Sequence, residues 1–332
     1  MAAYVLRRIL LVLPTILGIT VVVFAVSRIA PGDPTIQAVA PGEQTNPQGS
    51  ADIHTLRKEL YGLNKPVPVQ YVHWLGHVVR LNFGDSIKHR RPVISLIAER
   101  LPVTLALSFI SFLIIYAVSI PTGIMAAARQ GEFFDKFSSM VLLILWSLPI
   151  MWVGRMLIGY FAGPTFKSWF PPAGLSSSNA DQLPFIPWLA DRLWHLILPV
   201  FCLTYTGFAY LAKQVRSAVL ENLRMDYVRA ARAKGLTSTA VLTRHVLPNS
   251  LIPLITIAAT LMPALFAGSV IVEKIFSIPG MGLLMFEAVA NRDYNVVMAV
   301  VTIAGALNSL GLLLADLTYA VVDPRVDFQN VL

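Results

Sequence analysis

Long apolar runs, separated by polar and basic segments, constrain this chain more than any other feature. The first run, 9–29, has the roughly 20-residue length that a helix needs to cross the hydrocarbon core of a bilayer. With 56% hydrophobic and only 13% charged residues, the 332-residue chain has too little polar surface for a soluble protein. The sequence therefore predicts an all-α integral membrane protein with six transmembrane helices. The predicted spans are 9–29, 101–128, 137–163, 196–212, 250–272 and 296–322.

The positions of the basic residues predict the topology. Arg7 and Arg8 precede the first run, and the segments 129–136 and 213–249 are also basic, so the positive-inside rule places all three on the cytoplasmic side. The net charge of +8 follows from these loops and does not indicate a nucleic-acid partner. We therefore expect a multi-pass protein of the bacterial cytoplasmic membrane, surrounded by lipid, with both termini cytoplasmic.

The stretch 226–248, DYVRAARAKGLTSTAVLTRHVLP, is polar and yet carries a strong helix signal. Gly235 suits the left-handed residue that ends a helix, and Thr237 or Ser238 can cap a second short helix. Pro248 is expected to end that second helix. The residues that recur at helical spacing in the first part are Tyr227, Ala230, Ala231 and Lys234. The pattern predicts a helix, a glycine turn and a second helix on the cytoplasmic side.

This stretch resembles the "EAA" loop of the membrane subunits of bacterial ABC importers. Ala230–Ala231, Gly235 and Leu247–Pro248 keep the spacing of that loop, whereas Arg229 and His245 stand where the pattern has Glu and Ile. Further stretches resemble the dipeptide, oligopeptide and nickel branch of these binding-protein-dependent systems, and together they extend the resemblance over nearly the whole chain. These stretches are PGDP at 31–34, NFGDSI at 82–87, FSIPGMG at 276–282, NRDY at 291–294 and DPRV at 323–326.

The resemblance implies a type I ABC importer permease fold. It divides the chain into an N-terminal transmembrane helix at 1–30, an extracytoplasmic loop region at 31–100, a permease domain at 101–322 and a cytoplasmic tail at 323–332. Within the permease domain of five helices, the loop 213–249 would carry the coupling helix that docks on an ATPase subunit. The residues to which the resemblance gives this coupling role are Asp226, Tyr227, Arg229, Ala230, Ala231, Lys234, Gly235, Leu247 and Pro248.

The resemblance also implies a function and a set of partners. The chain would be the pore-forming subunit of an ATP-driven importer of di- or oligopeptides, or of nickel. It would work with two ABC ATPase subunits, a second permease that is a paralogue, and an extracytoplasmic solute-binding protein. ATP and Mg would be bound by the partner subunits, with no cofactor in this chain. Consistent with this, the sequence has no G-x-x-x-x-G-K-[ST] loop, no H-E-x-x-H and no G-x-S-x-G, so no catalytic or metal-binding residues are expected.

Two charged residues fall inside predicted spans, and charges at membrane depth are costly. Arg155 and Asp316 are therefore candidate pore or interhelix residues, although Arg155 could equally extend to the interface. His73 and His77 are four residues apart on an expected short helix at 71–79, and an interfacial helix is the favoured interpretation over a metal site.

Two other classes of function stay open at this point. A secondary transporter driven by an ion gradient would need ionisable groups at mid-membrane and often an inverted repeat. A structural membrane protein would have no conduit at all. Whether uptake stops on ATP depletion or on addition of an uncoupler separates the first class from an ATP-driven importer.

Overall fold

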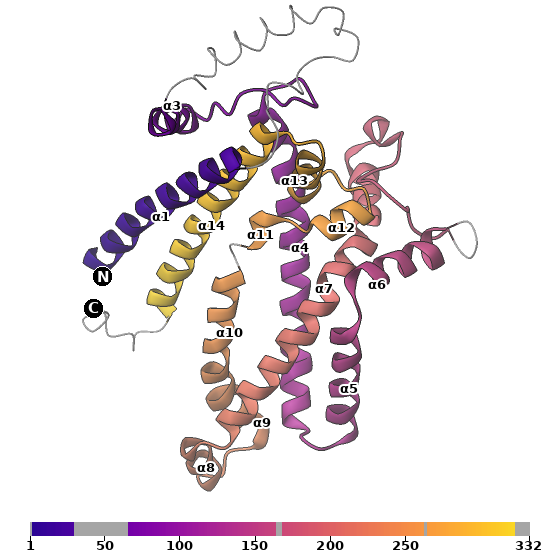
Figure 1. Cartoon of the computed structure of the whole chain (residues 1–332). Helices are drawn as coiled ribbons and strands as arrows, with labels where there is room; N and C mark the ends of the chain where they lie inside the picture. Colours follow the sequence, from indigo (N-terminus) through magenta and orange to yellow (C-terminus); the bar gives the residue numbers. More distant parts are fainter. Residues whose placement is uncertain (1, 30–65, 164–167, 262–263, 323–332) are drawn as a thin grey trace, which may run out of the picture. The chain divides into compact units, whose positions relative to one another are not determined.

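The computed structural model describes residues 2–29, 66–163, 168–261 and 264–322, and every regular element within these ranges is a helix. The chain divides into two compact units (Figure 1). Unit 1 comprises Met1–Pro102 with Leu284–Leu310, and unit 2 comprises Val103–Leu283 with Gly311–Leu332.

Unit 1 contains α1 (Ala2–Ile29), α3 (Val67–Val79) and parts of α4 (Val93–Ala128), α13 (Met281–Ala290) and α14 (Tyr294–Val322). The expected helix at 71–79 is confirmed and begins four residues earlier. The sequence also predicts a short helix at 52–63, and these residues lie outside the described part of the chain. In Figure 1, α3 is viewed nearly along its axis while α1 is seen from the side, so α3 crosses α1.

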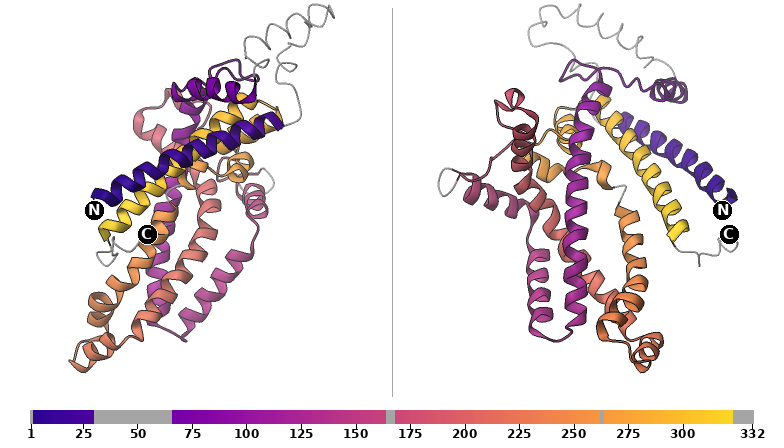
Figure 2. Two further views of the ribbon diagram at one scale, coloured as in Figure 1. Left: turned by 60° about the vertical axis from the view of Figure 1, so that its left-hand side comes forward. Right: turned by 180° about the vertical axis from the view of Figure 1, so that it is seen from behind.

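Unit 2 is built around the long helix α7 (Phe185–Leu223), which packs on α4, on α5 (Phe133–Ser147) and on α10 (Leu247–Leu261). Figure 2 shows these helices from two further sides. α4 and α7 lie unusually close together, since a Cβ added at Gly123 would stand only 2.6 Å from the carbonyl oxygen of Ala212. The shorter elements are α6 (Ile150–Leu157), a π-helical turn (Ile158–Ala162), a 3-10 turn (Ala180–Gln182), α8 (Asp226–Ala233), α9 (Ser238–Val241), a second π-helical turn (Leu242–Val246), α11 (Ala264–Ala267) and α12 (Val270–Ile275).

By length and composition, four of the described helices can span a membrane as single rods. They contain the apolar stretches Leu10–Ile29, Val93–Ala128, Phe185–Leu223 and Tyr294–Leu314. The span predicted at 137–163 is a bent pair instead, because α5 and α6 meet at an angle of 94°. Leu148 is extended, as the residue before a proline tends to be, and Pro149 then starts α6 in a new direction.

The span predicted at 250–272 is not a single long helix either. The helical pattern is interrupted at Gly268 and Ser269, just before α12. Before this break α10 is described to Leu261 and α11 covers Ala264–Ala267, while residues 262–263 between them are not described. The described residues therefore support four spans, or five if the bent pair counts as one, while the predicted six remain an expectation.

The helix that contains the predicted fourth span extends beyond that span at both ends. Residues 196–212 form only the middle of α7, which also covers the ends of two segments expected to be loops. Both of these ends carry charged side chains that have partners in the structure. The Asp191 carboxylate accepts hydrogen bonds from Ser177, and Arg216 is paired with Asp135. Similarly, α4 begins at Val93 rather than at residue 101.

Candidate functional site

The expected first helix of the 226–248 segment is present as α8, at one end of unit 2 (Figure 1). Only Val228 and Ala231 of α8 are buried, and they pack in the same apolar cluster as Val215 and Val219 of α7. The two buried residues are three apart and share one side of the helix. α8 is thus held by a narrow apolar stripe, and its remaining side chains face outward.

Gly235 ends this helix as the sequence predicts. Its φ is +81°, in the left-handed region that favours glycine. The Gly235 N–H donates to the Arg232 carbonyl at 2.9 Å, and the Leu236 N–H donates to the Ala231 carbonyl at 3.4 Å. This pair of bonds is the Schellman arrangement, which satisfies carbonyls that the end of a helix would leave unpaired. The turn therefore fixes the direction in which the chain leaves α8.

The second helix begins as expected but does not end as expected. Thr237 is its N-cap, with its side-chain oxygen accepting from the Ala240 N–H at 3.3 Å. The chain then passes through the π-helical turn Leu242–Val246 directly into α10, so the prediction that Pro248 stops the helix was wrong. A proline in a regular α-helix clashes with the carbonyl four residues earlier, and the wider π turn just before Pro248 relieves this conflict.

The outward face of α8 combines small and charged residues. Ala230 and Ala233 are exposed, and so are Asp226 and Arg229, whose side chains lie 3.3 Å apart. An ion pair this exposed contributes little to stability. Of the other predicted site residues in this segment, the structure leaves Tyr227, Lys234, Gly235 and Pro248 exposed and Leu247 partly buried. Nearly all of the predicted coupling residues are therefore accessible in this chain, and only Ala231 lies in its core.

A buried ion pair that sequence reasoning missed ties α7 to α5. The Asp135 carboxylate accepts bonds from Arg216 Nε at 2.6 Å and from Arg216 Nη2 at 2.8 Å. It also accepts the Gly131 N–H at 2.9 Å, so the turn before α5 is held as well. Asp135 was assigned to a short loop, and nothing in its local sequence points to a partner 81 residues away.

A second feature missed from the sequence is the buried carboxylate of Glu273 on α12, which is fully shielded from solvent. It accepts the Thr104 hydroxyl at 3.1 Å and the Leu283 N–H at 2.8 Å. Gly280 passes so close that an added Cβ would lie 2.5 Å from the Glu273 Cδ atom. Burial raises the pKa of Glu273 above its ordinary value, although the hydrogen bonds oppose that shift. The FSIPGMG stretch thus wraps around this carboxylate.

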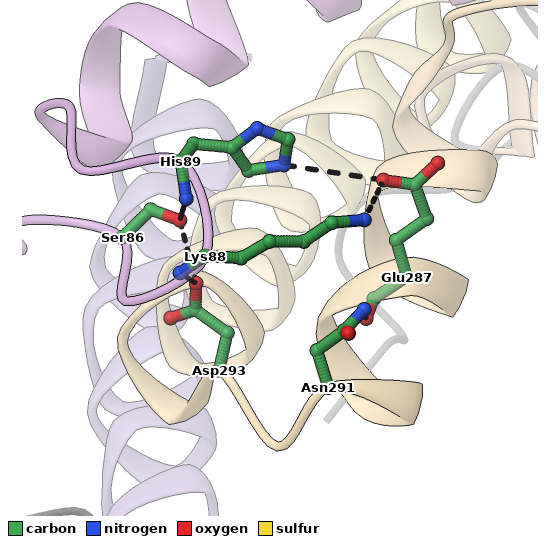
Figure 3. A network of polar contacts seen from close by, with 6 residues as sticks. All are labelled: Ser86, Lys88, His89, Glu287, Asn291 and Asp293. Carbon is green, nitrogen blue, oxygen red and sulfur yellow. Dashed lines mark hydrogen bonds and ion pairs between the residues drawn. The ribbon is translucent and has the colours of Figure 1, made fainter. Parts of the chain in front are cut away.

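In unit 1 the NFGDSI and NRDY stretches, which are about 200 residues apart, meet in one polar network (Figure 3). The Ser86 hydroxyl donates to the buried Asp293 carboxylate at 2.6 Å, and the Lys88 N–H reaches the same oxygen at 3.3 Å. Glu287 accepts Lys88 Nζ at 2.8 Å, with His89 Nε2 at 3.9 Å from the same carboxylate oxygen. This clasp, residues 82–92 with 287–295, fixes the chain before α4 to the turn between α13 and α14.

The structure gives little information on the role of the two candidate intramembrane charges, Arg155 and Asp316. Arg155 is exposed on α6 and makes no ion pair with a carboxylate among the described residues. Asp316 lies in α14. The pore or interhelix role therefore remains a hypothesis for both.

Comparison with known proteins decides the family. Residues 119–328 match the family described as binding-protein-dependent transport system inner membrane component, and residues 1–108 match the corresponding N-terminal family. The chain belongs to this family of inner-membrane transport components. It is 40% identical to the oligopeptide transport system permease protein AppB of Bacillus subtilis (strain 168), over 99% of this chain and 100% of that protein. It is 33% identical to the dipeptide transport system permease protein DppB of Alkalihalophilus pseudofirmus, with the same coverage.

A solved structure shows the fold of this permease family member independently. An inward-facing structure of the MetNI methionine ABC transporter superposes with a TM-score of 0.51 at 18% identity, covering 69% of this chain and 97% of the matched chain. At that level of identity the likeness supports the fold alone, and it covers nearly the whole of the matched subunit. The resemblance inferred from the EAA-like loop is therefore confirmed at the level of family and fold.

Proposed function

We propose that this permease is a pore-forming subunit of an ATP-driven importer that carries peptides across the cytoplasmic membrane. Two relatives that match along their whole length are named for oligopeptide and dipeptide transport, which supports peptides as the solute. The proposed assembly contains two ATPase subunits, a second and paralogous permease, and an extracytoplasmic solute-binding protein. Both termini and the 226–248 segment face the cytoplasm in this proposal, and the chain crosses the membrane six times.

The single observation that carries the coupling role is the way α8 is presented. Its inner side is anchored on α7 through Val228 and Ala231, while Ala230 and Ala233 lie on its outward face. Small side chains on an exposed helix let a second protein surface approach the backbone closely. A helix that is both firmly anchored and accessible is suited to receive a push from an ATPase subunit and to pass it on.

The chemistry of the step lies in the partners, and this chain's part is mechanical. ATP bound between the two ATPase subunits would supply the free energy. The residues of the 226–248 segment would convert the closure of those subunits into a displacement of α7 and α10, to which the segment is joined. Arg155 and Asp316 remain the candidate pore or interhelix residues of this proposal.

The test is purification of the tagged permease from its native membrane under gentle conditions, followed by reconstitution of the complex with its binding protein. We expect ATPase subunits and a second permease to co-purify, and peptide uptake to require ATP and to persist with an uncoupler. Uptake that stops with the uncoupler but continues without ATP would reject the proposal in favour of an ion-driven transporter.

A matched pair of variants tests the docking face. Ala230→Trp places a bulky side chain on the exposed face of α8 without disturbing its buried stripe, and we expect it to abolish co-purification of the ATPase subunits. Asn179→Trp makes the same addition at an exposed position preceding the 3-10 turn of unit 2 and should leave the complex intact. Equal behaviour of the two variants would count against α8 as the docking element.

A further inference from the structure

The helix α3 has three different faces. Its 13 residues include no charged side chain. At about 100° per residue, the helical positions separate into three sectors. The first sector is at least partly buried and contains Tyr71, Trp74, Leu75 and Val78. The second sector is apolar and exposed and contains Val69, Val72, Gly76 and Val79. The third is polar and exposed and contains His73 and His77.

The first sector docks on α1. The Tyr71 hydroxyl and the Thr20 hydroxyl lie 2.9 Å apart, and the Phe24 ring is 5.5 Å from the Tyr71 ring and 5.6 Å from the Trp74 ring, centroid to centroid. These contacts fix the rotation of α3 about its own axis. The valine sector and the histidine sector are thereby held on opposite flanks of the docked face.

The docking site also lies on a helix that is a candidate membrane span. α1 is a candidate span that ends at Ile29, and Thr20 and Phe24 lie about 13 and 8 Å before that end at 1.5 Å per residue. Arg28, whose guanidinium carbon lies 5.0 Å from the Phe24 ring centroid, marks the level where side chains reach the headgroups. α3 therefore packs against the half of this candidate span that ends at Ile29.

We propose that α3 is an interfacial helix whose valine sector is inserted among the acyl chains of the leaflet at the Ile29 end of α1. Val72 and Val79 are 67% and 77% exposed in the chain, which would be unfavourable in water but is favourable in lipid. His73 and His77 then face the headgroups and water. An element with one apolar and one polar flank is the type of helix that lies in the plane of a membrane surface.

This placement has a consequence for the clasp of unit 1. α3 ends at Val79, and the Asn82 N–H still donates to the His77 carbonyl at 3.0 Å, so the chain passes from the interfacial helix into the clasp without a free linker. The lipid contact of α3 would thereby set the height above the membrane at which residues 82–92 and 287–295 are presented. The inference needs only that α1 spans the membrane and does not depend on the identity of the solute.

Spin labels at neighbouring residues test the proposal in the full-length permease. Val72→Cys and His73→Cys are adjacent in the sequence but lie on different flanks, and both are exposed, so a label at either site leaves the α1 contact intact. The native Cys202 is buried. As a control, the permease without an introduced cysteine is treated with the spin label to verify that Cys202 does not react. The assembled complex is placed in nanodiscs of phosphatidylethanolamine and phosphatidylglycerol, and collision rates with oxygen and with a water-soluble nickel chelate are measured.

We expect the oxygen-to-nickel ratio at Val72 to exceed that at His73 several-fold and to approach the ratio at Leu13, an exposed residue within the α1 span. The pair Val79→Cys and His77→Cys should repeat this difference. Equal ratios on the two flanks would overturn the proposal. So would a valine flank shielded from both reagents, because it would mean that protein rather than lipid covers α3.

Discussion

Replacing Gly235 in three ways separates backbone strain at the end of α8 from every other effect. The φ of +81° costs an ordinary L-residue about 1–2 kcal/mol. A Cβ added there would meet no atom within 4 Å, so Gly235→Ala carries this conformational cost and no steric clash. Asn tolerates the left-handed region better, and Gly235→Asn should cost less than Gly235→Ala. Gly235→Pro is more severe, about 3 kcal/mol or more, because proline fixes φ near −65° and removes the N–H that donates to Arg232.

Whether a substitution at Gly235 releases α8 depends on how its cost compares with the free energy that holds α8 against α7. Its buried stripe consists of Val228 and Ala231, and full burial of one valine with one alanine supplies roughly 2–3 kcal/mol. The cost of proline exceeds this anchoring, whereas the costs of alanine and asparagine do not. We therefore expect Gly235→Pro to release α8 from α7, while Gly235→Ala and Gly235→Asn keep it docked.

The assay combines two readouts on the reconstituted complex. Hydrogen exchange of the α8 amides should rise sharply only in Gly235→Pro, and peptide uptake per ATP hydrolysed should fall in the same variant while the protein still inserts and assembles. Gly131→Ala is the matched control, because Gly131 has a φ of +83° and an added Cβ would meet no atom within 4 Å, but it lies far from this segment along the chain. Normal coupling in Gly235→Pro, or equal losses in Gly235→Pro and Gly235→Ala, would refute the reasoning.

Three further predictions concern the buried polar groups of unit 2. Asp135→Asn removes the charge opposite the Arg216 guanidinium, which is 27% exposed, and should destabilise the protein by about 1–3 kcal/mol in thermal unfolding in detergent. Glu132→Gln, at an exposed position, is the control and should change the free energy of unfolding by less than about 0.5 kcal/mol. Gly280→Ala drives a methyl group into the Glu273 carboxylate and should cost about 1–3 kcal/mol, which a normal melting temperature would contradict. Because burial raises the pKa of Glu273, the folded state holds its proton more tightly, so stability should fall as the pH rises above the ordinary carboxyl range. Glu273→Gln should flatten that part of the pH profile, and an unchanged profile would show that another group titrates.

Local sequence signals predicted the 226–248 segment well. The positive φ of Gly235 and the cap at Thr237 both follow from the chemistry of single residues, and the structure has both. The error at Pro248 shows the limit of such signals. Proline was treated as a helix stop, but a π turn before it lets the helix continue into α10. The change from α-helical to π-helical hydrogen bonding covers only the five residues Leu242–Val246 and cannot be recognised from their composition.

Long-range polar pairs account for most of the other differences. Hydropathy ends the fourth span where charges begin, yet α7 continues through Arg216, whose guanidinium is paired with Asp135. The sequence gives no indication of a role for Glu273, since neither the glycines that surround its carboxylate nor its bond to Thr104 can be recognised from its neighbours in the sequence. Without an alignment, no signal in a single sequence pairs residues that are 81 or 169 positions apart.

The connections of the 226–248 segment to α7 and α10 favour a displacement that is passed on by rigid-body movement of these helices over one absorbed by bending at a hinge. On one side, α8 is separated from α7 only by Arg224 and Met225, and the Tyr227 hydroxyl donates to Asn222 at 2.7 Å across that junction. On the other side, beyond the Gly235 turn, α9 runs without interruption through the π-helical turn into α10. The Ser250 hydroxyl lies 2.8 Å from the Val246 carbonyl oxygen and 3.3 Å from that of Ala218, so it ties α10 back to α7. A push on α8 must therefore move both helices together, and the ion pair to α5 extends the moving body. Mutations that loosen these ties should uncouple ATP hydrolysis from transport without changing either partner's binding surface.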